Sequence, residues 1–349
     1  MTVLQPVRKT PQFADTQIEM AHGAGGIASR RLVEGLIGSY LSNPILQTFA
    51  DAAMISVNGS NVATTADGFV VNPLRFPGGS IGELAVNGTL NDLAVSAAKP
   101  IALMATLILE AGLPTSTLES EVEAMAIAAR KAGVCIVGGD TKVVEHGKAD
   151  GMYVSTFGIG LVDARITIDP ASIQPGDRIL LSGPIGAHGI TILLARGELD
   201  LQAELLSDTR PVWPFVSALM DRCASAVRWM RDPTRGGVAT SLNELVRGTA
   251  YGVAIYEDCV PMHDAVRGAC ELLGLDPLHI ANEGQFLAVV AAEHADAALA
   301  AVRGVTGGEE AILIGEVRAE PKQRVIGING YGGTRVIDML VGDPLPRIC

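Results

Sequence analysis

Apolar and polar positions in the first half of the chain predict a mixture of helices and strands. Residues 1–16 show no useful pattern and are interpreted as an irregular arm. The glycine turn HGAGG opens segment 22–41, where apolar pairs recur one turn apart and predict a helix. The runs 53–57 and 61–71 favour short strands, and the strongly apolar IALMATLILE at 101–110 predicts a longer one.

Three more elements complete this half. Ser116 and Glu119 have capping-box spacing and predict the start of a helix that ends at Gly133. The segment VCIVGGD at 134–140 is interpreted as a buried strand that runs into a loop, and YVSTFGIGLV at 153–162 as another strand. The glycine-rich stretch 75–100 receives no element.

The polar, proline-containing segment 169–179 is the best candidate for a domain boundary. We therefore predict a two-domain α/β (α+β) fold with an N-terminal domain at 17–168, a C-terminal domain at 169–330 and a tail at 331–349. No internal repeat is present. The elements predicted for the second domain are strand 178–183, helix 188–198, helix 236–249, strand 252–257, strand 286–292 and strand 311–317.

Composition supports aliphatic cores and argues against some partners. Hydrophobic residues make up 48% of the 349 positions but aromatic residues only 4%, and 40 glycines with 18 prolines suit an α/β fold with tight loops. The net charge of −12 without any basic run argues against nucleic-acid and anionic-membrane partners. Since no segment has the length of a membrane span or the form of a signal peptide, we expect a cytoplasmic protein.

The chain has 5 cysteines without a CxxC pair or zinc-like spacing. Cys135, Cys223, Cys259 and Cys270 lie in apolar stretches and are predicted to be core residues. The fifth, Cys349, ends the chain in GDPLPRIC, where two prolines hold it away from the body. It is either an accident of the reading frame or a reactive sulfur on a movable arm.

Aspartates recur beside Gly, Thr or Asn, and we place them at loop ends. Carboxylates spread over several loops suit Mg²⁺, which binds through a few carboxylates together with substrate phosphates. The alternative is that such residues simply form turns. Neither GxxxxGKS/T nor a GxGxxG that follows a strand is present. The aspartates are Asp51, Asp67, Asp92, Asp140 and Asp232.

Three other side chains are candidates for chemistry. Lys142 could neutralise phosphate charge, although it could equally be a solvated lysine. Arg235 precedes a glycine pair that opens a helix, which is a ready anion site. Glu283 in IANEGQF could act as a general base or be a loop carboxylate. No role is assigned to His22 or His188.

Several segments taken together resemble one family, the HypE carbamoyl dehydratases of nickel–iron hydrogenase maturation. The resemblance covers about residues 17–349. DPTRGG and the aspartate loops are also similar to aminoimidazole-ribonucleotide synthetase and selenophosphate synthetase. The segments are HGAGG, TTADGFVVNPLRFPGGSIGELAVNGTLNDLAVSAAKP, VGGDTKVV, SGPIGAHG, DPTRGG, NEGQ and the terminal PRIC.

The resemblance implies a homodimer of PurM-like subunits whose N-terminal strands form a β-barrel across the dimer, with Mg-ATP between the domains and a flexible C-terminal tail. It implies that HypF carbamoylates Cys349, that ATP drives dehydration to a thiocyanate, and that HypC–HypD accepts the cyano group on iron. The implied catalytic residues are Cys349, Glu283, Lys142 and Asp92; those binding the nucleotide are Asp67, Gly88, Thr89, Asn91, Asp140, Thr141, Arg235 and Gly236; those binding metal are Asp51, Asp67, Asp92 and Asp232.

A thiol with an ordinary pKa is only slightly ionised at neutral pH, so we expect a cation beside Cys349, either Arg347 or one from the partner. Two other functions remain open. One is an ATP-dependent small-molecule synthase or kinase on the same scaffold, which would not need a terminal cysteine. The other is a nucleotide-responsive assembly scaffold whose tail is only a docking peptide.

Overall fold

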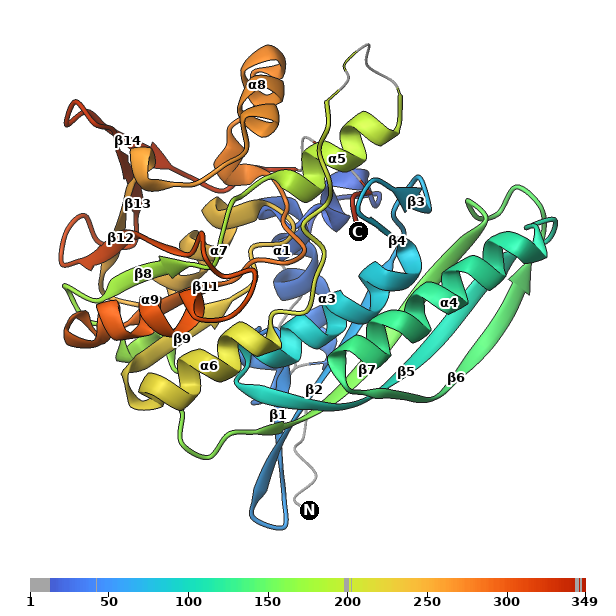
Figure 1. The fold of residues 1–349 in the computed structure, drawn as a ribbon, viewed down its shortest axis with the longest axis horizontal. Helices are drawn as coiled ribbons and strands as arrows, with labels where there is room; N and C mark the ends of the chain where they lie inside the picture. The colour runs from blue at the N-terminus through green and yellow to red at the C-terminus, as the bar shows by residue number, and fades with distance from the viewer. Residues whose placement is uncertain (1–12, 42, 198–200, 202, 343–344, 346) are drawn as a thin grey trace.

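The computed structural model describes residues 13–41, 43–197, 201, 203–342, 345 and 347–349, and Figure 1 shows their arrangement. Each half of the chain builds its own large sheet, of five strands in the first half and seven in the second. Helices cover one face of the first sheet and both faces of the second (Figure 1). No helix within the described residues is both long and apolar enough to cross a bilayer.

The first sheet is antiparallel except for the parallel pair of β5 and β6. The helices α3 (Ile81–Val95) and α4 (Thr115–Ala132) lie against it, with α3 between the sheet and the second half of the chain. The strand order is β1 (Ala53–Val57), β2 (Ser60–Phe69), β7 (Met152–Val162), β5 (Ala98–Glu110) and β6 (Cys135–Val144).

Helix α3 occupies the glycine-rich stretch to which the sequence assigned no element. All of its residues except Glu83 and Asp92 are buried, so it has no polar face that would show a helical period. Its glycines allow close packing, since a Cβ at Gly82 would lie 2.2 Å from the Glu121 carbonyl oxygen of α4. A small hairpin of β3 (Arg75–Phe76) and β4 (Gly79–Ser80) precedes it.

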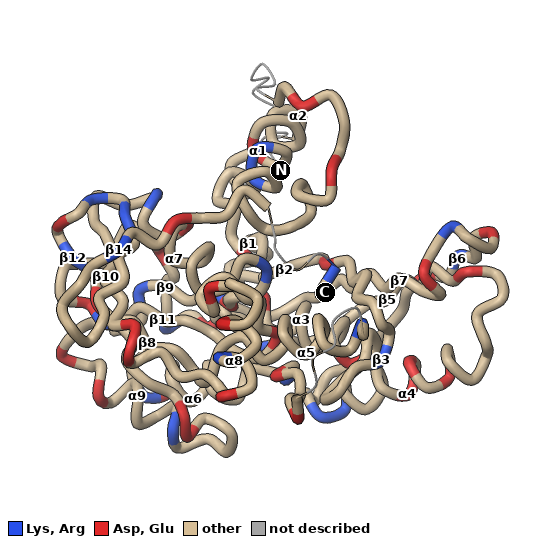
Figure 2. The backbone as a smooth tube through the Cα atoms, turned by 90° about the horizontal axis from the view of Figure 1, so that it is seen from above, with Lys and Arg blue, Asp and Glu red and all other residues tan. Residues whose placement is uncertain are grey.

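Two predictions for this half are wrong in detail. Helix α4 begins at Thr115 with Pro114 as its N-cap, so Ser116 is not the cap, although the helix does end at Gly133. Strand β6 is not buried and does not end in a loop, because it forms the exposed edge of the sheet and continues through Val144. Viewed from above, the ends of β5, β6 and β7 project away from the rest of the chain (Figure 2).

The face of the first sheet opposite α3 is apolar and exposed. Met104 of β5 and Phe157 of β7 are paired across the two strands, and their exposed fractions are 45% and 42%. Leu161, four residues after Phe157 in β7, lies on the same face and is also exposed. No part of the described chain covers these side chains.

The second sheet is antiparallel except for the parallel pair of β10 and β13. Helices α6 (Trp213–Cys223) and α9 (Ala295–Arg303) cover one face, and α7 (Gly237–Arg247) covers the other. Its order is β14 (Thr334–Ile337), β13 (Val325–Ile328), β10 (Gly252–Tyr256), β12 (Ile312–Arg318), β8 (Arg178–Leu181), β11 (Leu287–Val290) and β9 (Val227–Arg231).

The helix predicted to follow the glycine turn HGAGG begins at Ile27, directly after that turn, but it is interrupted. It consists of α1 (Ile27–Leu32), the π-helical turn η2 (Val33–Ile37) and α2 (Gly38–Leu41). Helices α5 (Ala187–Ala195) and α8 (Asp264–Leu273) lie beside each other in the second half. Short turns complete the chain: η1 (Met20–Gly23), η3 (Leu46–Thr48), η4 (Pro170–Ser172), η5 (Ala224–Ala226), η6 (Glu257–Cys259), η7 (Pro277–His279) and η8 (Ala292–His294).

The predicted tail is partly built into the fold. Residues 334–337 form β14, which pairs with β13 at the edge of the second sheet. The carbonyls of Leu340 and Val341 then accept hydrogen bonds from the amides of Ile27 and Ala28 at the start of α1. The end of the chain returns to the first sheet and lies near β3 and β4 (Figure 1).

Candidate active site

Three aspartates from distant parts of the chain form what we call the carboxylate cluster. Asp51, Asp92 and Asp232 each place one carboxylate oxygen within 4.8 Å of the others. Asp51 lies just before β1, and Asp232 directly follows β9. Asp92 lies in α3 rather than at a loop end as predicted, and it reaches the other two because α3 lies between the two halves.

Two threonines orient the side chains of Asp92, which belongs to the cluster, and of Asp67. The Thr65 hydroxyl donates to Asp92 Oδ2 at 2.7 Å, and the Thr89 hydroxyl donates to Asp67 Oδ2 at 2.9 Å. Thr65 and Asp67 alternate along β2 and therefore point to the same face, toward α3. Asp67 is thus a strand residue, contrary to its predicted place at a loop end, and it is not one of the three clustered carboxylates.

Burial and mutual repulsion raise the pKa of every carboxyl in the cluster. Burial raises the pKa of Asp51 to about 8, against the pull of Arg231 and with added repulsion from the other acids. Burial also raises the pKa of Asp232, to about 6, and that of Asp92 well above its usual range. Ionisation of several carboxyl groups close together in a buried site is unfavourable, and such a site therefore favours binding of a cation.

The donor set fits Mg²⁺. Its ligands are usually hard oxygen atoms, and it commonly binds to a few carboxylates while keeping positions for substrate phosphates. The carboxylate cluster supplies three such groups within ligand distance of one another. Three of the four predicted metal ligands are therefore brought together, and Asp67 lies next to them with its carboxylate tied to Thr89.

Arg231 is a site residue that the sequence analysis missed. Its Nε lies 2.9 Å from Asp51 Oδ1, and its Nη2 lies 2.9 Å from Glu244 Oε2. The arginine neutralises part of the cluster charge and fixes one of the cluster carboxylates. Its position directly before Asp232 in RDPTRGG was the available signal, because both residues lie at the end of one strand.

Glu283 is buried with an exposed fraction of 3%, and its Oε1 has no hydrogen-bond partner among the described residues. Burial raises its pKa well above the usual range, repulsion from Asp232 and Asp208 adds to this, and Arg235 opposes it. Asp208, also missed, accepts hydrogen bonds from the amides of Glu283 and Gly284, each at 3.2 Å. Asp208 therefore holds the loop that carries Glu283.

The predicted nucleotide-binding residues of α3 differ in what they can do. A Cβ at Gly88 would lie 2.9 Å from the Phe69 ring and 3.8 Å from Glu283 Oε2, so only glycine fits there. Asn91 uses its amide for main-chain groups, donating to the carbonyls of Arg210 and Glu283 and accepting from the Val212 amide. Asn91 therefore joins α3 to the second half of the chain.

Arg235 lies next to the end of the chain. Attraction to the charge of Cys349 is the largest cause that raises the pKa of this arginine. Its Nη1 donates to the Gly23 carbonyl at 3.0 Å. Gly236 is the N-cap of α7 with a φ of 74°, and a Cβ there would lie 2.2 Å from the Thr240 hydroxyl, so glycine is required.

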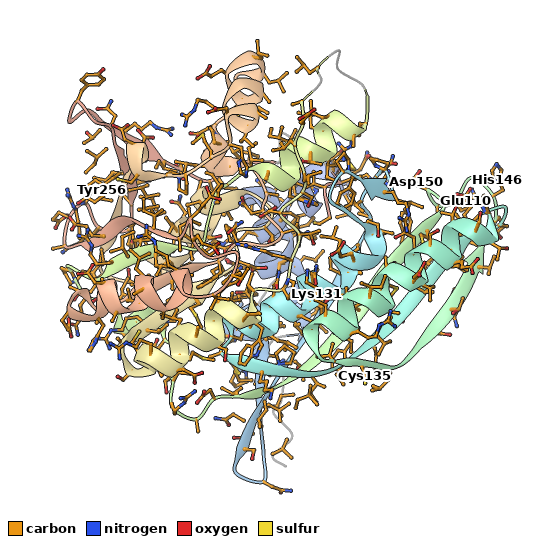
Figure 3. All side chains as sticks on the ribbon, in the orientation of Figure 1. Glu110, Lys131, Cys135, His146, Asp150 and Tyr256 are labelled. Atoms are coloured by element: carbon orange, nitrogen blue, oxygen red, sulfur yellow. The ribbon has the colours of Figure 1, made fainter. Side chains whose placement is uncertain are left out.

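The terminal cysteine lies against the body of the protein. The Val70 amide donates to a terminal carboxylate oxygen of Cys349 at 3.0 Å, and the preceding Ile348 is buried. Arg347, which was expected to stabilise the thiolate, instead donates to the Val70 carbonyl and forms an ion pair with Asp150. Figure 3 shows Asp150 beside the β3–β4 hairpin, and the cation whose pKa the charge of Cys349 raises is Arg235.

The four other cysteines divide into two pairs. Cys223 and Cys270 are buried as predicted, whereas Cys135 and Cys259 are exposed. Cys135 starts the edge strand β6, where Figure 3 shows it, and Cys259 ends the turn η6. The core prediction was wrong for these two because an apolar stretch at a sheet edge or in a surface turn is not enclosed.

Asp140, Thr141 and Lys142 form an edge segment that the single chain does not bring to the cluster. All three are exposed on β6, where Lys142 pairs with Asp140 and the Thr141 amide donates to Asp140 Oδ1 at 2.8 Å. Two strands, β7 and β5, separate β6 from β2. At the usual strand spacing this is about 14 Å across the sheet. Asp140 is therefore a strand residue, not a loop-end ligand.

Comparisons with known proteins agree with this arrangement. Two family models, AIR synthase related protein N-terminal domain and C-terminal domain, match residues 49–162 and 174–328. Carbamoyl dehydratase HypE from Rhizobium leguminosarum bv. viciae is 43% identical over 347 residues, which cover 99% of this chain and 99% of that protein.

Two solved structures are similar over most of their length. Hydrogenase maturation protein HypE in complex with ATP is 41% identical with a TM-score of 0.79, covering 95% of this chain and 100% of that chain. The HypE–HypF complex gives 40% identity and a TM-score of 0.84, covering 88% of this chain and 99% of that chain. Together with the family models, these matches confirm the predicted two-domain PurM-like α/β fold.

Proposed function

This chain belongs to the HypE family of carbamoyl dehydratases, and we propose that it converts a thiocarboxamide on Cys349 to a thiocyanate with ATP as co-substrate. The observation that carries the proposal is that the end of the chain closes onto the body of the protein: the Val70 amide, directly after β2, binds Cys349, and the charge of Cys349 acts on Arg235 together with those of Glu283, Asp67 and Asp92. A relative of this family binds ATP in a solved complex. The terminal thiol favours this reaction over a small-molecule synthase or kinase.

The proposed chemistry runs in two steps. The thiocarboxamide oxygen attacks the γ-phosphorus of ATP, ADP leaves, and the nitrogen loses one proton. The C–O bond then breaks, phosphate leaves with that oxygen, and the nitrogen loses its second proton as the C≡N bond forms. Thiocarboxamide and ATP thus become thiocyanate, ADP and inorganic phosphate.

Residues near Cys349 suit the proton transfers and the phosphate charge. Glu283 has an unpartnered carboxylate oxygen and a raised pKa, so in its ionised form it is a strong base for the amide proton. The charge of Cys349 acts on Arg235, and this arginine would hold the oxygen that becomes phosphorylated. Thr89 keeps the Asp67 carboxylate in place beside them.

We also propose that Asp51, Asp92 and Asp232 hold Mg²⁺. Bound there, the ion would neutralise charge on the phosphates of the nucleotide. The close approach of three carboxylates with raised pKa supports this assignment.

The proposed carbamoyl donor is HypF, because a relative forms a complex with it. The proposed acceptor is the HypC–HypD complex, which would place the cyano group on iron destined for a nickel–iron hydrogenase. All five cysteines of this chain are free, which supports action in the reducing cytoplasm.

We further propose a homodimer of subunits with domains at 17–168 and 169–330, joined through the first sheet. The exposed apolar face that includes Met104 and Phe157 supports such an interface, since it would otherwise contact water. Asp140, Thr141 and Lys142 lie too far from the cluster of their own chain. If they serve the reaction, they serve the site of the second subunit.

Mass spectrometry tests the proposal. The protein is incubated with HypF, carbamoyl phosphate and Mg-ATP, and the C-terminal peptide is analysed over time. We expect a carbamoyl adduct on Cys349 that later loses one water, and no adduct on the Cys349→Ser variant. An unmodified peptide on the wild-type chain, or a Cys349→Ser variant that still supports hydrogenase maturation, would favour the docking scaffold.

A further inference from the structure

The last three residues are held by their main chain. The carbonyl oxygens of Arg347 and Ile348 and a terminal carboxylate oxygen of Cys349 each accept a hydrogen bond from a different donor. These donors are Arg196 Nη2 at 2.7 Å, His188 Nε2 at 2.7 Å and the Val70 amide at 3.0 Å. We call the three donors the tail dock.

Apolar contacts secure the same residues. Ile348 and Leu345 are 2% and 4% exposed and belong to one hydrophobic cluster with residues of α5 and α8. Gly189, next to His188, allows Ile280 of the same cluster to pack closely, since a Cβ at this glycine would lie 2.6 Å from Ile280 Cγ2. The hydrogen bond between His188 and the Ile348 carbonyl therefore lies in a closed, apolar environment in which an unpaired carbonyl would be costly.

The hydrogen-bond network sets the tautomer of His188. The Ser207 hydroxyl oxygen accepts from the Thr209 amide at 3.1 Å, so its own proton is available to His188 Nδ1 at 2.8 Å. The other ring nitrogen, Nε2, then carries the proton that it donates to the Ile348 carbonyl. Burial lowers the pKa of His188 and favours this neutral form, and the Phe76 ring packs edge-on against the imidazole.

We propose that His188 is a positioning residue for dehydration, because it fixes the Ile348 carbonyl and thereby holds Cys349 against the body of the protein at the end of β2. It acts through the main chain, so it contacts neither the nucleotide nor the sulfur. This inference rests on the proposed function. Carbamoylation of Cys349 requires that the tail leave the dock. Loss of His188 should therefore impair dehydration without impairing carbamoylation.

The first test measures docking without activity. His188→Phe keeps a ring of similar size and removes the Nε2 donor. In the intact protein, the rate of Cys349 alkylation by iodoacetamide is compared with that of exposed Cys259 in the same sample, peptide by peptide. We expect alkylation of Cys349 to become about tenfold faster, the equivalent of one lost buried hydrogen bond, with Cys259 unchanged.

The second test separates the two reactions at Cys349. With HypF, carbamoyl phosphate and Mg-ATP, the variant should be carbamoylated at the wild-type rate and should lose water about tenfold more slowly. His188→Gln, whose amide can still donate, should recover most of the dehydration rate. A purely structural role would lower loading and dehydration together and would not be rescued in this way.

His279→Phe is the matched control. His279 is also buried and also bonds through Nε2 to a main-chain carbonyl of the terminal segment, that of Asp338 at 2.9 Å, but outside the dock. It should leave Cys349 alkylation unchanged. If His188→Phe does not fold, Arg196→Met removes the neighbouring dock donor and should give the same changes.

Wild-type alkylation and dehydration rates in folded His188→Phe, or in folded Arg196→Met if that variant replaces it, would overturn the inference. A wild-type chain that never loses water would instead overturn the proposed function, while the alkylation result would still decide whether the dock exists.

Discussion

The carboxylate cluster and the edge segment lie at opposite sides of the first sheet and have opposite electrostatic surroundings. In the cluster, Asp92 is enclosed with two other acids, and burial together with repulsion raises its pKa. In the edge segment, Asp140 is exposed, and hydrogen bonds from Lys142 and from the Thr141 amide lower its pKa. Arg231 neutralises only part of the cluster charge, whereas Asp140 is paired with Lys142.

This difference indicates different tasks. A cluster of carboxylates whose ionisation is unfavourable can bind a cation within its own chain. An exposed strand edge whose charges are already paired can instead contact another molecule. The apolar face beside β6 supports a second subunit as that molecule. The predictions below test this separation, beginning with the side that should have the larger effect.

Glu283→Gln should have the largest effect, lowering the dehydration rate about 10²–10⁴-fold because general-base catalysis contributes this much. The substitution keeps the size of the side chain and removes the proton acceptor. Loss of water from carbamoylated Cys349 is followed by mass spectrometry. Glu145→Gln, at an exposed position just beyond β6, is the matched control and should leave the rate unchanged. Full activity of Glu283→Gln would remove the proposed base.

A mixed dimer should show on which subunit the edge segment acts. Glu283→Gln and Lys142→Ala are expected to be inactive alone. In an equal mixture, half of the dimers are hybrids, and each hybrid has one intact site if Lys142 serves the other subunit. About a quarter of wild-type activity should then return in co-expressed, differently tagged chains. No recovery would place Lys142 and Glu283 in the same chain's site.

Stability should depend on pH and Mg²⁺ through the cluster. Asp51 has a pKa of about 8 in the folded chain against 3.8 as a model value, so between these values the folded state alone keeps the proton. The metal-free protein should therefore lose stability as pH rises from about 4 to 8. Mg²⁺ should raise the apparent melting temperature by about 3–5 °C at pH 8 and less at pH 6.

The Mg²⁺ experiment uses one variant in the carboxylate cluster and one in the edge segment. Asp51→Asn should remove most of the pH-dependent Mg²⁺ effect, measured by calorimetry. Asp140→Asn should preserve it, because the pKa of Asp140 is lowered and its carboxylate is exposed. An equal Mg²⁺ effect at both pH values would contradict the assignment of the cluster as the metal site.

Regular periodicity allowed much of the second half to be predicted from sequence, including α5, α7 and the strands β8, β10, β11 and β12. Helix α3 could not be recognised, since a helix buried almost all round has no polar stripe, and its glycines resembled a loop. Asp92 was misplaced for the same reason. The exposed position of β6 depends on which strand is its neighbour, and local sequence does not contain that information.

The site was predicted as a set of residue types but not as a geometry. Asp51, Asp92 and Asp232 were named together, and the structure places them within 4.8 Å. Arg231 and Asp208 were missed because each acts on a partner far away in sequence, the first on Asp51 and the second on the amide of Glu283. The first pairing arises only when the two halves pack, and the second only when the second half folds.

The smallest effect is expected for Thr65, and Thr141 of the edge segment is its matched control. Thr65→Val removes the 2.7 Å hydrogen bond to Asp92 Oδ2 while keeping the shape of a buried strand residue. Hydrogen bonds that orient metal ligands typically affect metal affinity 10–100-fold, so we expect Mg²⁺ to bind about tenfold more weakly by calorimetric titration. Thr141→Val on the exposed β6 should leave this affinity unchanged, since Thr141 bonds Asp140 through its main-chain amide. Equal losses in both variants would mean that cluster and edge segment act on one ion, and the separation argued above would fail.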